Sequence, residues 1–155
     1  MRKKKTIAIV AHDNRKLDLM EWVEYNAVKI SRHRIVCTGT TGRLIEERFQ
    51  KCLSDDQFEE LQLVKLKSGP LGGDQQLGSL IVDGSIDLMI FFWDPMMPQP
   101  HDVDVKALLR ITVLYNIPTA CNRSTADFII SSNLFNDEYT PRIDDFSGYI
   151  NRELQ

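Results

Sequence analysis

The chain has 155 residues, of which 43% are hydrophobic, and its 19 Lys and Arg against 22 Asp and Glu give a net charge of −3. This length and composition predict one globular domain over residues 1–155. The charge balance excludes a broad basic surface for nucleic acid. The longest apolar run, Leu88–Trp93, is too short to span a bilayer, and no apolar signal region follows Arg2–Lys5. We therefore expect a cytoplasmic protein without a membrane or nucleic-acid partner.

The three cysteines, Cys37, Cys52 and Cys121, show neither a CxxC motif nor the spacing of a zinc site. Their odd number favours a reducing compartment over a disulfide scaffold. We expect all three to be buried apolar groups. The basic segment Arg2–Lys5 is interpreted as a solvated tail. We expect neither a metal nor a cofactor.

Strand and helix patterns alternate along the chain. Thr6–Ala11 is a continuous apolar run, typical of a strand covered on both faces, and Lys16–Val28 then shows helical spacing. Later strands are predicted at 34–38, 61–66, 86–93 and 119–121, and later helices at 43–51, 74–82, 103–115, 125–130 and 146–154. This order predicts an α/β fold with three α/β/α layers and a mostly parallel five-stranded sheet.

Polar residues follow the predicted strands. Because parallel strands align their carboxyl ends on one edge of the sheet, where open α/β folds hold ligands, we expect these residues to meet there. Chance would scatter them over both edges. The segments concerned are His12–Lys16, Thr38–Gly42, Ser68–Asp74 and Asp94, followed by His101, Asp102, Asp104 and, after the fifth strand, Asn122.

The glycine-rich segment Ser68–Gly78 carries a single carboxylate, Asp74. A glycine-rich turn exposes main-chain N–H groups that can hold an anion. Since a carboxylate repels phosphate, Asp74 beside such a turn suggests a base that acts on a neighbouring carbon. The alternative is a tight turn in which Asp74 caps the next helix.

Thr38–Gly42 joins a strand to a helix, so its N–H groups lie near the positive end of a helix dipole and its hydroxyls offer further donors. Because it lacks the Gly-Lys-[Ser/Thr] ending of a P-loop, the expected ligand is a phosphate group that does not belong to a metal-bound nucleotide. Lys16, one helical turn after His12, could add a positive charge. The alternatives are an exposed lysine and a capping pair at His12 and Asp13.

His101 follows two prolines in a stiffened connection. A histidine held in this way can pass protons between two substrate oxygens near neutral pH. Asp94, Asp102 and Asp104 are candidates to orient its ring, although for Asp102 we favour a capping role. The alternative is a surface ring at His101.

Together these segments resemble the methylglyoxal synthase family over roughly residues 5 to 130. The resemblance is carried by Ala11-His12-Asp13, Thr38-Gly-Thr-Thr-Gly42, Ser68-Gly-Pro-Leu-Gly-Gly-Asp74-Gln-Gln, Phe91-Phe-Trp-Asp-Pro95, Pro100-His101, Asp104-Val-Lys-Ala-Leu-Leu-Arg110 and Asn116-Ile-Pro-Thr-Ala-Cys-Asn122. It implies conversion of dihydroxyacetone phosphate to methylglyoxal and phosphate. It also implies a homohexamer, and phosphate as product and inhibitor.

The resemblance also implies roles for individual residues. Asp74 would be the base that takes a proton from carbon, and His101 would polarise the enediolate oxygens and shuttle protons. The phosphate would be held by Lys16, Thr38, Gly39, Thr40, Thr41, Ser68 and Gly69. The catalytic polar shell would be completed by His12, Asp13, Asp94 and Asp104.

The chain departs from the family pattern at two places. Extra residues between Gly42 and Ser68 include the acidic Ser54–Glu60, expected to form a surface loop or a short helix. Near the C-terminus, Arg152 is displaced by one position from an arginine that the family often supplies to a neighbouring subunit. One position turns a helical side chain by about 100°.

Two other functions compete with an enzyme. A regulatory domain of the same fold would bind a small phosphorylated effector through Thr38–Gly42 without needing Asp74 and His101. An interaction protein would use Trp93, Pro95, Met96 and Met97, which adjoin the proposed site. Since both Asp74 and His101 are present, we favour the enzyme.

Overall fold

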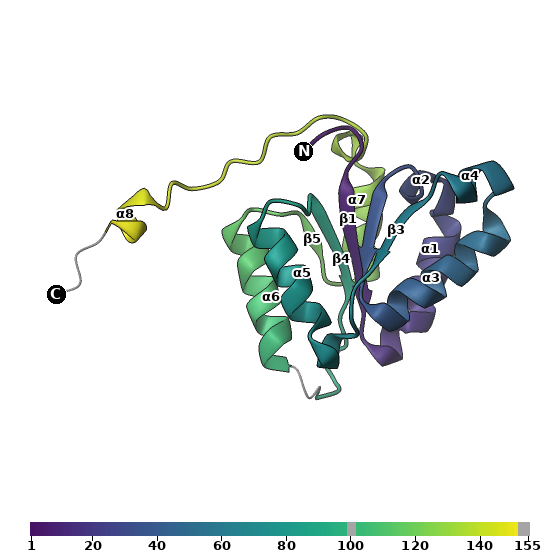
Figure 1. Ribbon diagram of the computed structural model, residues 1–155, viewed down its shortest axis with the longest axis horizontal. Helices are drawn as coiled ribbons and strands as arrows, with labels where there is room; N and C mark the ends of the chain where they lie inside the picture. The colour runs from purple at the N-terminus through teal and green to yellow at the C-terminus, as the bar shows by residue number, and fades with distance from the viewer. Residues whose placement is uncertain (99–101, 152–155) are drawn as a thin grey trace.

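In a computed structural model, which describes residues 1–98 and 102–151, helices cover both faces of a five-stranded sheet (Figure 1). All strand pairs are parallel, in the order β3-β2-β1-β4-β5. The strands are β1 (Thr6–Ala11), β2 (Arg34–Cys37), β3 (Gln62–Lys65), β4 (Leu88–Phe92) and β5 (Thr119–Ala120). The predicted α/β fold is confirmed, and each predicted strand is present within a few residues of its expected bounds.

The core has one apolar layer on each face of the sheet. Helices α1 (Lys16–Tyr25), α3 (Gly39–Cys52) and α7 (Arg123–Ser131) cover one face and pack around Trp22, Phe49 and Phe92. Helices α5 (Gly73–Val82) and α6 (Asp102–Leu114) cover the other, over Leu77 and Phe91. Because β1 and β4 are buried on both sides, their sequences are continuous apolar runs.

The helix predicted over Lys16–Val28 is interrupted. A 3-10 turn, η1 (Asp13–Arg15), leads into α1, and a short helix, α2 (Ala27–Ile30), follows it. The side chain of Asn26 between them donates to the Trp22 carbonyl at 2.9 Å. The main-chain N–H of Asn26 donates to the same carbonyl at 3.1 Å, so Asn26 caps the last turn of α1 with both its backbone and its side chain.

The helix predicted at 43–51 begins earlier, at Gly39. Thr38 has extended backbone angles, and its carbonyl accepts from the N–H of Gly42 at 2.8 Å. Thr38–Gly42, which was predicted to connect a strand to a helix, is therefore the cap and first turn of α3. The acidic segment Ser54–Glu60 forms α4 (Asp55–Glu59), which begins with a capping box between Ser54 and Gln57.

Two expectations about single residues were wrong. Lys5 is buried, not part of a solvated tail, and its ammonium group donates to the carbonyl oxygens of Asp137, at 2.7 Å, and Arg2. These bonds offset the cost of covering a charge. Cys52 is exposed near the end of α3, whereas Cys37 is buried and Cys121 half-buried.

The C-terminal segment leaves the body of the molecule. After η3 (Asn133–Phe135) the chain runs past the N-terminus, where the N–H of Tyr139 donates to Met1, and past Asn116, whose side chain donates to the Arg142 carbonyl. It then reaches α8 (Ser147–Ile150), which lies away from the sheet in Figure 1. Arg152, which was compared above with the arginine that the family often supplies to a neighbouring subunit, lies outside the described residues.

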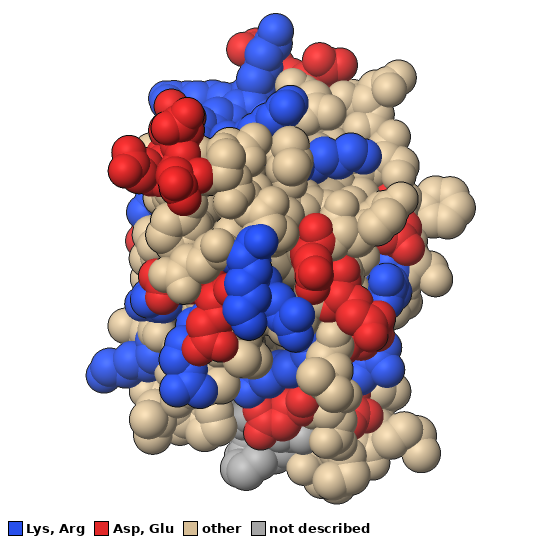
Figure 2. Space-filling view, turned by 90° about the vertical axis from the view of Figure 1, so that its right-hand side faces the viewer, with Lys and Arg blue, Asp and Glu red and all other residues tan. Residues whose placement is uncertain are grey.

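Charges of both signs are interspersed over the face that carries α1, α3 and α4, as Figure 2 shows. Several are paired, including Arg48 with Glu24 at 3.1 Å and Lys65 with Glu46 at 2.7 Å. Among the described residues this face therefore presents no single-sign field for a nucleic acid.

Candidate active site

A cavity of about 210 Å³ opens at the carboxyl ends of the strands, as predicted from the sheet topology. Polar residues line it from three successive connections: those after β1, β2 and β3. The lining residues that the sequence singled out are His12, Asp13, Lys16, Thr38, Thr40, Thr41, Ser68, Gly69 and Asp74. The remaining lining residues are Val10, Ala11, Pro70, Phe91 and Val105.

The connection after β2 delivers hydroxyl groups at a helix N-terminus. Thr38, Thr40 and Thr41 lie on the cap and first turn of α3, where the first N–H groups have no partner within the helix. Thr41 is 1% exposed, and its Oγ1 has no hydrogen-bond partner among the described residues. A buried hydroxyl left in this state is suited to an anionic ligand.

Gly39 does not line the cavity. Its N–H donates to the Lys67 carbonyl at 3.1 Å and so ties the start of α3 to the connection after β3. A Cβ at Gly39 would lie 3.2 Å from both the Leu66 carbonyl and the Ser68 nitrogen. Contact between Gly39 and a substrate stays a prediction.

The glycine-rich connection after β3 is a compact turn. The Ser68 carbonyl accepts from the N–H groups of Leu71 and Gly73, and Gly72 has a φ of +93°, which favours glycine. Gly72, not Asp74, is the cap of α5. The capping alternative for Asp74 was therefore wrong.

Asp74 lies in the first turn of α5, is 5% exposed, and lines the cavity. The positive end of the helix dipole lies at this turn and favours a negative charge there. The geometry thus brings a buried carboxylate and the hydroxyls of α3 to one cavity, as the sequence predicted.

The connection after β1 supplies a histidine, a carboxylate and a lysine. The Nδ1 of His12 accepts from the main-chain N–H of Asp94 at 3.2 Å, and its ring meets the Phe91 ring edge-on at 5.1 Å. Lys16 forms an ion pair with Asp13. The Lys16 side chain is largely covered, whereas that of Asp13 is 87% exposed. Neither the exposed-lysine nor the capping alternative describes this arrangement, since the His12 side chain makes no cap bond.

Asp94 and Asp104 do not line the cavity. The Asp94 carboxylate accepts from the Asn14 side chain at 2.9 Å and from the Met96 N–H at 3.0 Å. These two bonds, led by that from Asn14, hold the pKa of Asp94 below its usual value. Asp104 lies in the first turn of α6, which reaches the cavity through Val105. Asp102 is the first residue of that helix, and His101 lies outside the described residues.

Sequence reasoning missed Asn14, Phe91 and Val105. Phe91 and Val105 read as ordinary core positions, because periodicity does not show which core residue also lines a cavity. Asn14 lies among residues that the sequence singled out, but its partner is 80 residues away. The fold alone brings it to Asp94.

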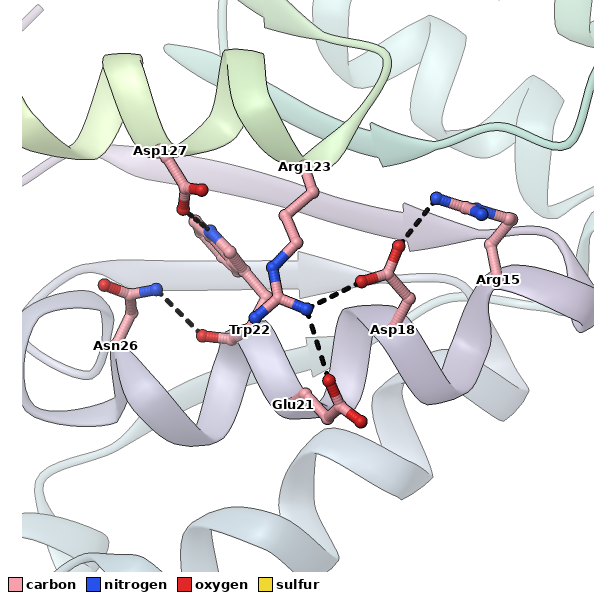
Figure 3. Close-up of polar contacts among 7 residues, drawn as sticks. All are labelled: Arg15, Asp18, Glu21, Trp22, Asn26, Arg123 and Asp127. Atoms are coloured by element: carbon pink, nitrogen blue, oxygen red, sulfur yellow. Dashed lines mark hydrogen bonds and ion pairs between the residues drawn. The ribbon is translucent and has the colours of Figure 1, made fainter.

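Ion pairs behind the site join α7 to α1 and η1 (Figure 3). Asp18 accepts from Arg15 at 2.6 Å and from Arg123 at 2.8 Å, and Arg123 also donates to Glu21 at 3.2 Å. One turn on, the Trp22 indole donates to Asp127 at 2.8 Å. These contacts hold the start of α1, which carries Lys16, against α7.

Residues 1–98 and 102–151 contain no group of three or more His, Cys, Asp or Glu placed to hold a metal ion. They also contain no helix long and apolar enough to cross a membrane.

The chain is similar to known proteins over nearly its whole length. A family model described as an MGS-like domain matches residues 18–121. Methylglyoxal synthase from Maridesulfovibrio salexigens is 56% identical, with 99% of this chain and 100% of that protein covered. The enzyme of the same name from Hahella chejuensis is 49% identical, with 96% and 90% covered.

A solved structure agrees with these relatives. The crystal structure of methylglyoxal synthase from Elizabethkingia anophelis has a TM-score of 0.89 and 48% identity, and the match covers 100% of this chain and 95% of that one. The chain belongs to the methylglyoxal synthase family.

Proposed function

We infer that this protein is a methylglyoxal synthase, a lyase that eliminates phosphate from dihydroxyacetone phosphate to give methylglyoxal. By its chemistry it is a carbon–oxygen lyase. The observation that carries the site assignment is the shared cavity, in which the buried carboxylate of Asp74 and the hydroxyls at the start of α3 come together.

Asp74 acts as the base in this proposal. It takes a proton from the hydroxymethyl carbon next to the carbonyl, and the electron pair of that C–H bond forms an enediolate. The enediolate then expels phosphate by breaking the C–O bond at the other carbon. The resulting enol regains a proton on carbon and becomes methylglyoxal. The reaction involves no net oxidation or reduction.

Phosphate leaves only when its C–O bond lies perpendicular to the enediolate plane, so the cavity has to fix one torsion angle. We assign that task to the first turn of α3, to Ser68 and Gly69, and to Lys16. The ion pair with Asp13 limits where the Lys16 ammonium group can lie. Main-chain N–H groups and hydroxyls held by a helix provide such preorganised donors.

His12 belongs to the same polar shell, and Asp13, Asp94 and Asp104 are assigned to it from the family pattern. The proton shuttle assigned to His101 is proposed from the sequence alone. Inorganic phosphate, as product, is expected to compete with substrate for the α3 turn and to inhibit.

Residues 1–155 are proposed to form one domain, and the working assembly to be a homohexamer in the cytoplasm. Light scattering of the purified protein tests the assembly, since six chains of 17.9 kDa are expected per particle.

The test of function is to mix the purified protein with dihydroxyacetone phosphate and follow methylglyoxal and phosphate together, with contaminating isomerase excluded. Equimolar release supports the synthase. Binding of phosphate without turnover would instead identify a regulatory module that binds a phosphorylated effector.

A further inference from the structure

The connections after β1 and β4 are joined by two hydrogen bonds that meet at Asp94. The Asn14 side chain, from the first connection, donates to Asp94 Oδ2 at 2.9 Å. The main-chain N–H of Asp94, from the second, donates back to the Nδ1 of His12 at 3.2 Å. Asn14 and His12 are therefore linked through a single residue of the neighbouring connection.

The second bond determines the chemical state of His12. A main-chain N–H can only donate, so the Nδ1 that accepts it carries no hydrogen. The neutral ring then has its hydrogen on Nε2, and any proton that His12 donates in the cavity comes from that atom. The edge-on contact with Phe91 at 5.1 Å fixes the plane of the ring but does not select the tautomer.

The first bond holds Asp94 in place for this task. Asp94 is 8% exposed, and its other carboxylate oxygen accepts from the Met96 N–H, within its own turn. Among the contacts described for this carboxylate, Asn14 is the one that reaches the connection after β1. Removing the Asn14 amide would free that turn to shift its N–H away from His12.

We propose that Asn14 is a positioning residue that, through Asp94, holds His12 as the neutral Nε2–H tautomer facing the substrate. The catalytic part of this proposal rests on the function proposed above. The tautomer part depends only on the fold.

The test compares the full-length protein with Asn14→Ala and Asn14→Asp. Asn14→Asp keeps the size of the side chain but sets a second carboxylate against Asp94, where like charges repel. The matched control is Asn26→Ala, which removes the same amide donor at the same 2.9 Å from a carbonyl away from the cavity. Long-range ¹H–¹⁵N spectra of labelled histidine report the tautomer of each of the three imidazoles.

We expect His12 to be in the Nε2–H form in the parent and in Asn26→Ala, and a mixture in both Asn14 variants. We expect kcat to fall about tenfold in Asn14→Ala, the size of one lost bond to a charged group, and further in Asn14→Asp. The affinity for inorganic phosphate should be unchanged, because the α3 turn is untouched. Because Asn26 is buried and Asn14 is exposed, a loss of stability alone would affect Asn26→Ala at least as strongly.

An unchanged tautomer in the Asn14 variants overturns the proposal, even if kcat falls. A changed tautomer with kcat within twofold of the parent overturns its catalytic part. If the parent itself releases no methylglyoxal, the proposed function fails, and the spectra still decide whether Asn14 positions His12.

Discussion

Gly73 lies directly against the main chain of Lys67: a Cβ atom at Gly73 would be 2.1 Å from the Lys67 carbonyl oxygen. This contact closes the turn that places Asp74 in the cavity. The Lys67 N–H is held in turn by the Gln76 side chain at 2.8 Å, and its carbonyl by Gly39. The start of α5 and the start of α3 therefore share one backbone segment.

Gly73→Ala is expected to push these two helix starts apart, because the clash is with backbone and not with a movable side chain. We expect about 2–3 kcal/mol lower free energy of unfolding, in the range of other overpacked sites, together with a large loss of kcat. Gly148→Ala is the control, since beyond its own helix no atom of the described residues lies within 4 Å of its Cβ position. Chemical denaturation and turnover measure both effects, and parent-like activity in Gly73→Ala would contradict the importance of the contact.

Asp74→Asn should nearly abolish turnover and leave phosphate binding largely intact, because the proposed base acts on carbon. Positioned general bases contribute about 10²–10⁴ in rate, so a loss of that size is expected. Calorimetric titration with phosphate, beside the turnover assay, separates the two effects. Retained turnover would move the base to another carboxylate, with Asp13 the first candidate.

Thr41→Val replaces a buried hydroxyl that has no partner among the described residues. Stability should therefore stay equal or rise, while phosphate binding weakens about tenfold through loss of one donor. Thr112→Val is the matched control: Thr112 is also 1% exposed, but its hydroxyl donates to the Leu109 carbonyl at 2.8 Å. That variant should lose about 1 kcal/mol of stability and keep its phosphate affinity. Unchanged phosphate affinity in Thr41→Val, together with weaker phosphate binding in Thr112→Val, would count against a ligand role for Thr41.

His33 should make stability depend on pH. Burial, with further contributions from Lys5, Lys4 and Arg32, lowers the pKa of His33 from 6.5 to about 4, against a weaker opposing effect of Asp87. Above pH 6.5 the ring is neutral in both states and contributes nothing. Between pH 6.5 and 4 only the unfolded chain takes the proton, so stability falls by up to about 3 kcal/mol as the pH drops through this range.

His33→Asn keeps an acceptor for the Lys5 N–H, which the Nδ1 of His33 accepts at 3.1 Å, but removes the titrating ring. Its free energy of unfolding should be lower than that of the parent at pH 7, since contact with Phe135 is lost. Between pH 6.5 and 4 it should fall less steeply. Parallel curves from urea denaturation across this range would show that His33 is not the titrating group.

The sequence predicted the order of elements because the continuous apolar runs of β1 and β4 and the spacing of α6 are strong local signals. It did not place the ends of α1 and α3, since these depend on the Asn26 side chain and on the backbone of Thr38. The burial of Lys5 depends on a carbonyl more than a hundred residues away, which no local pattern reports.

The sequence likewise predicted part of the candidate site. His12 and Thr38, which follow β1 and β2 directly, lie in the cavity, because a parallel sheet brings strand ends together. The place of a residue along its connection did not decide the rest: Asp94 follows β4 closely and lies off the cavity, whereas Asp74 comes later after β3 and lines it. Asp104 lies off the cavity, and the contact of Asn14 with Asp94 emerged only from the structure.

The central position of β1 bears on how the chain is made. Ile7 pairs with Ile35 on one side and with Leu88 on the other, so the middle of the sheet closes only after more than half of the chain exists. Pairings between such distant segments form slowly, after the local helices. Since Phe91 and Val105 complete the cavity wall, a nascent chain that ends before β4 lacks part of that wall, and the capacity to produce a reactive dicarbonyl arises only after synthesis has passed Val105.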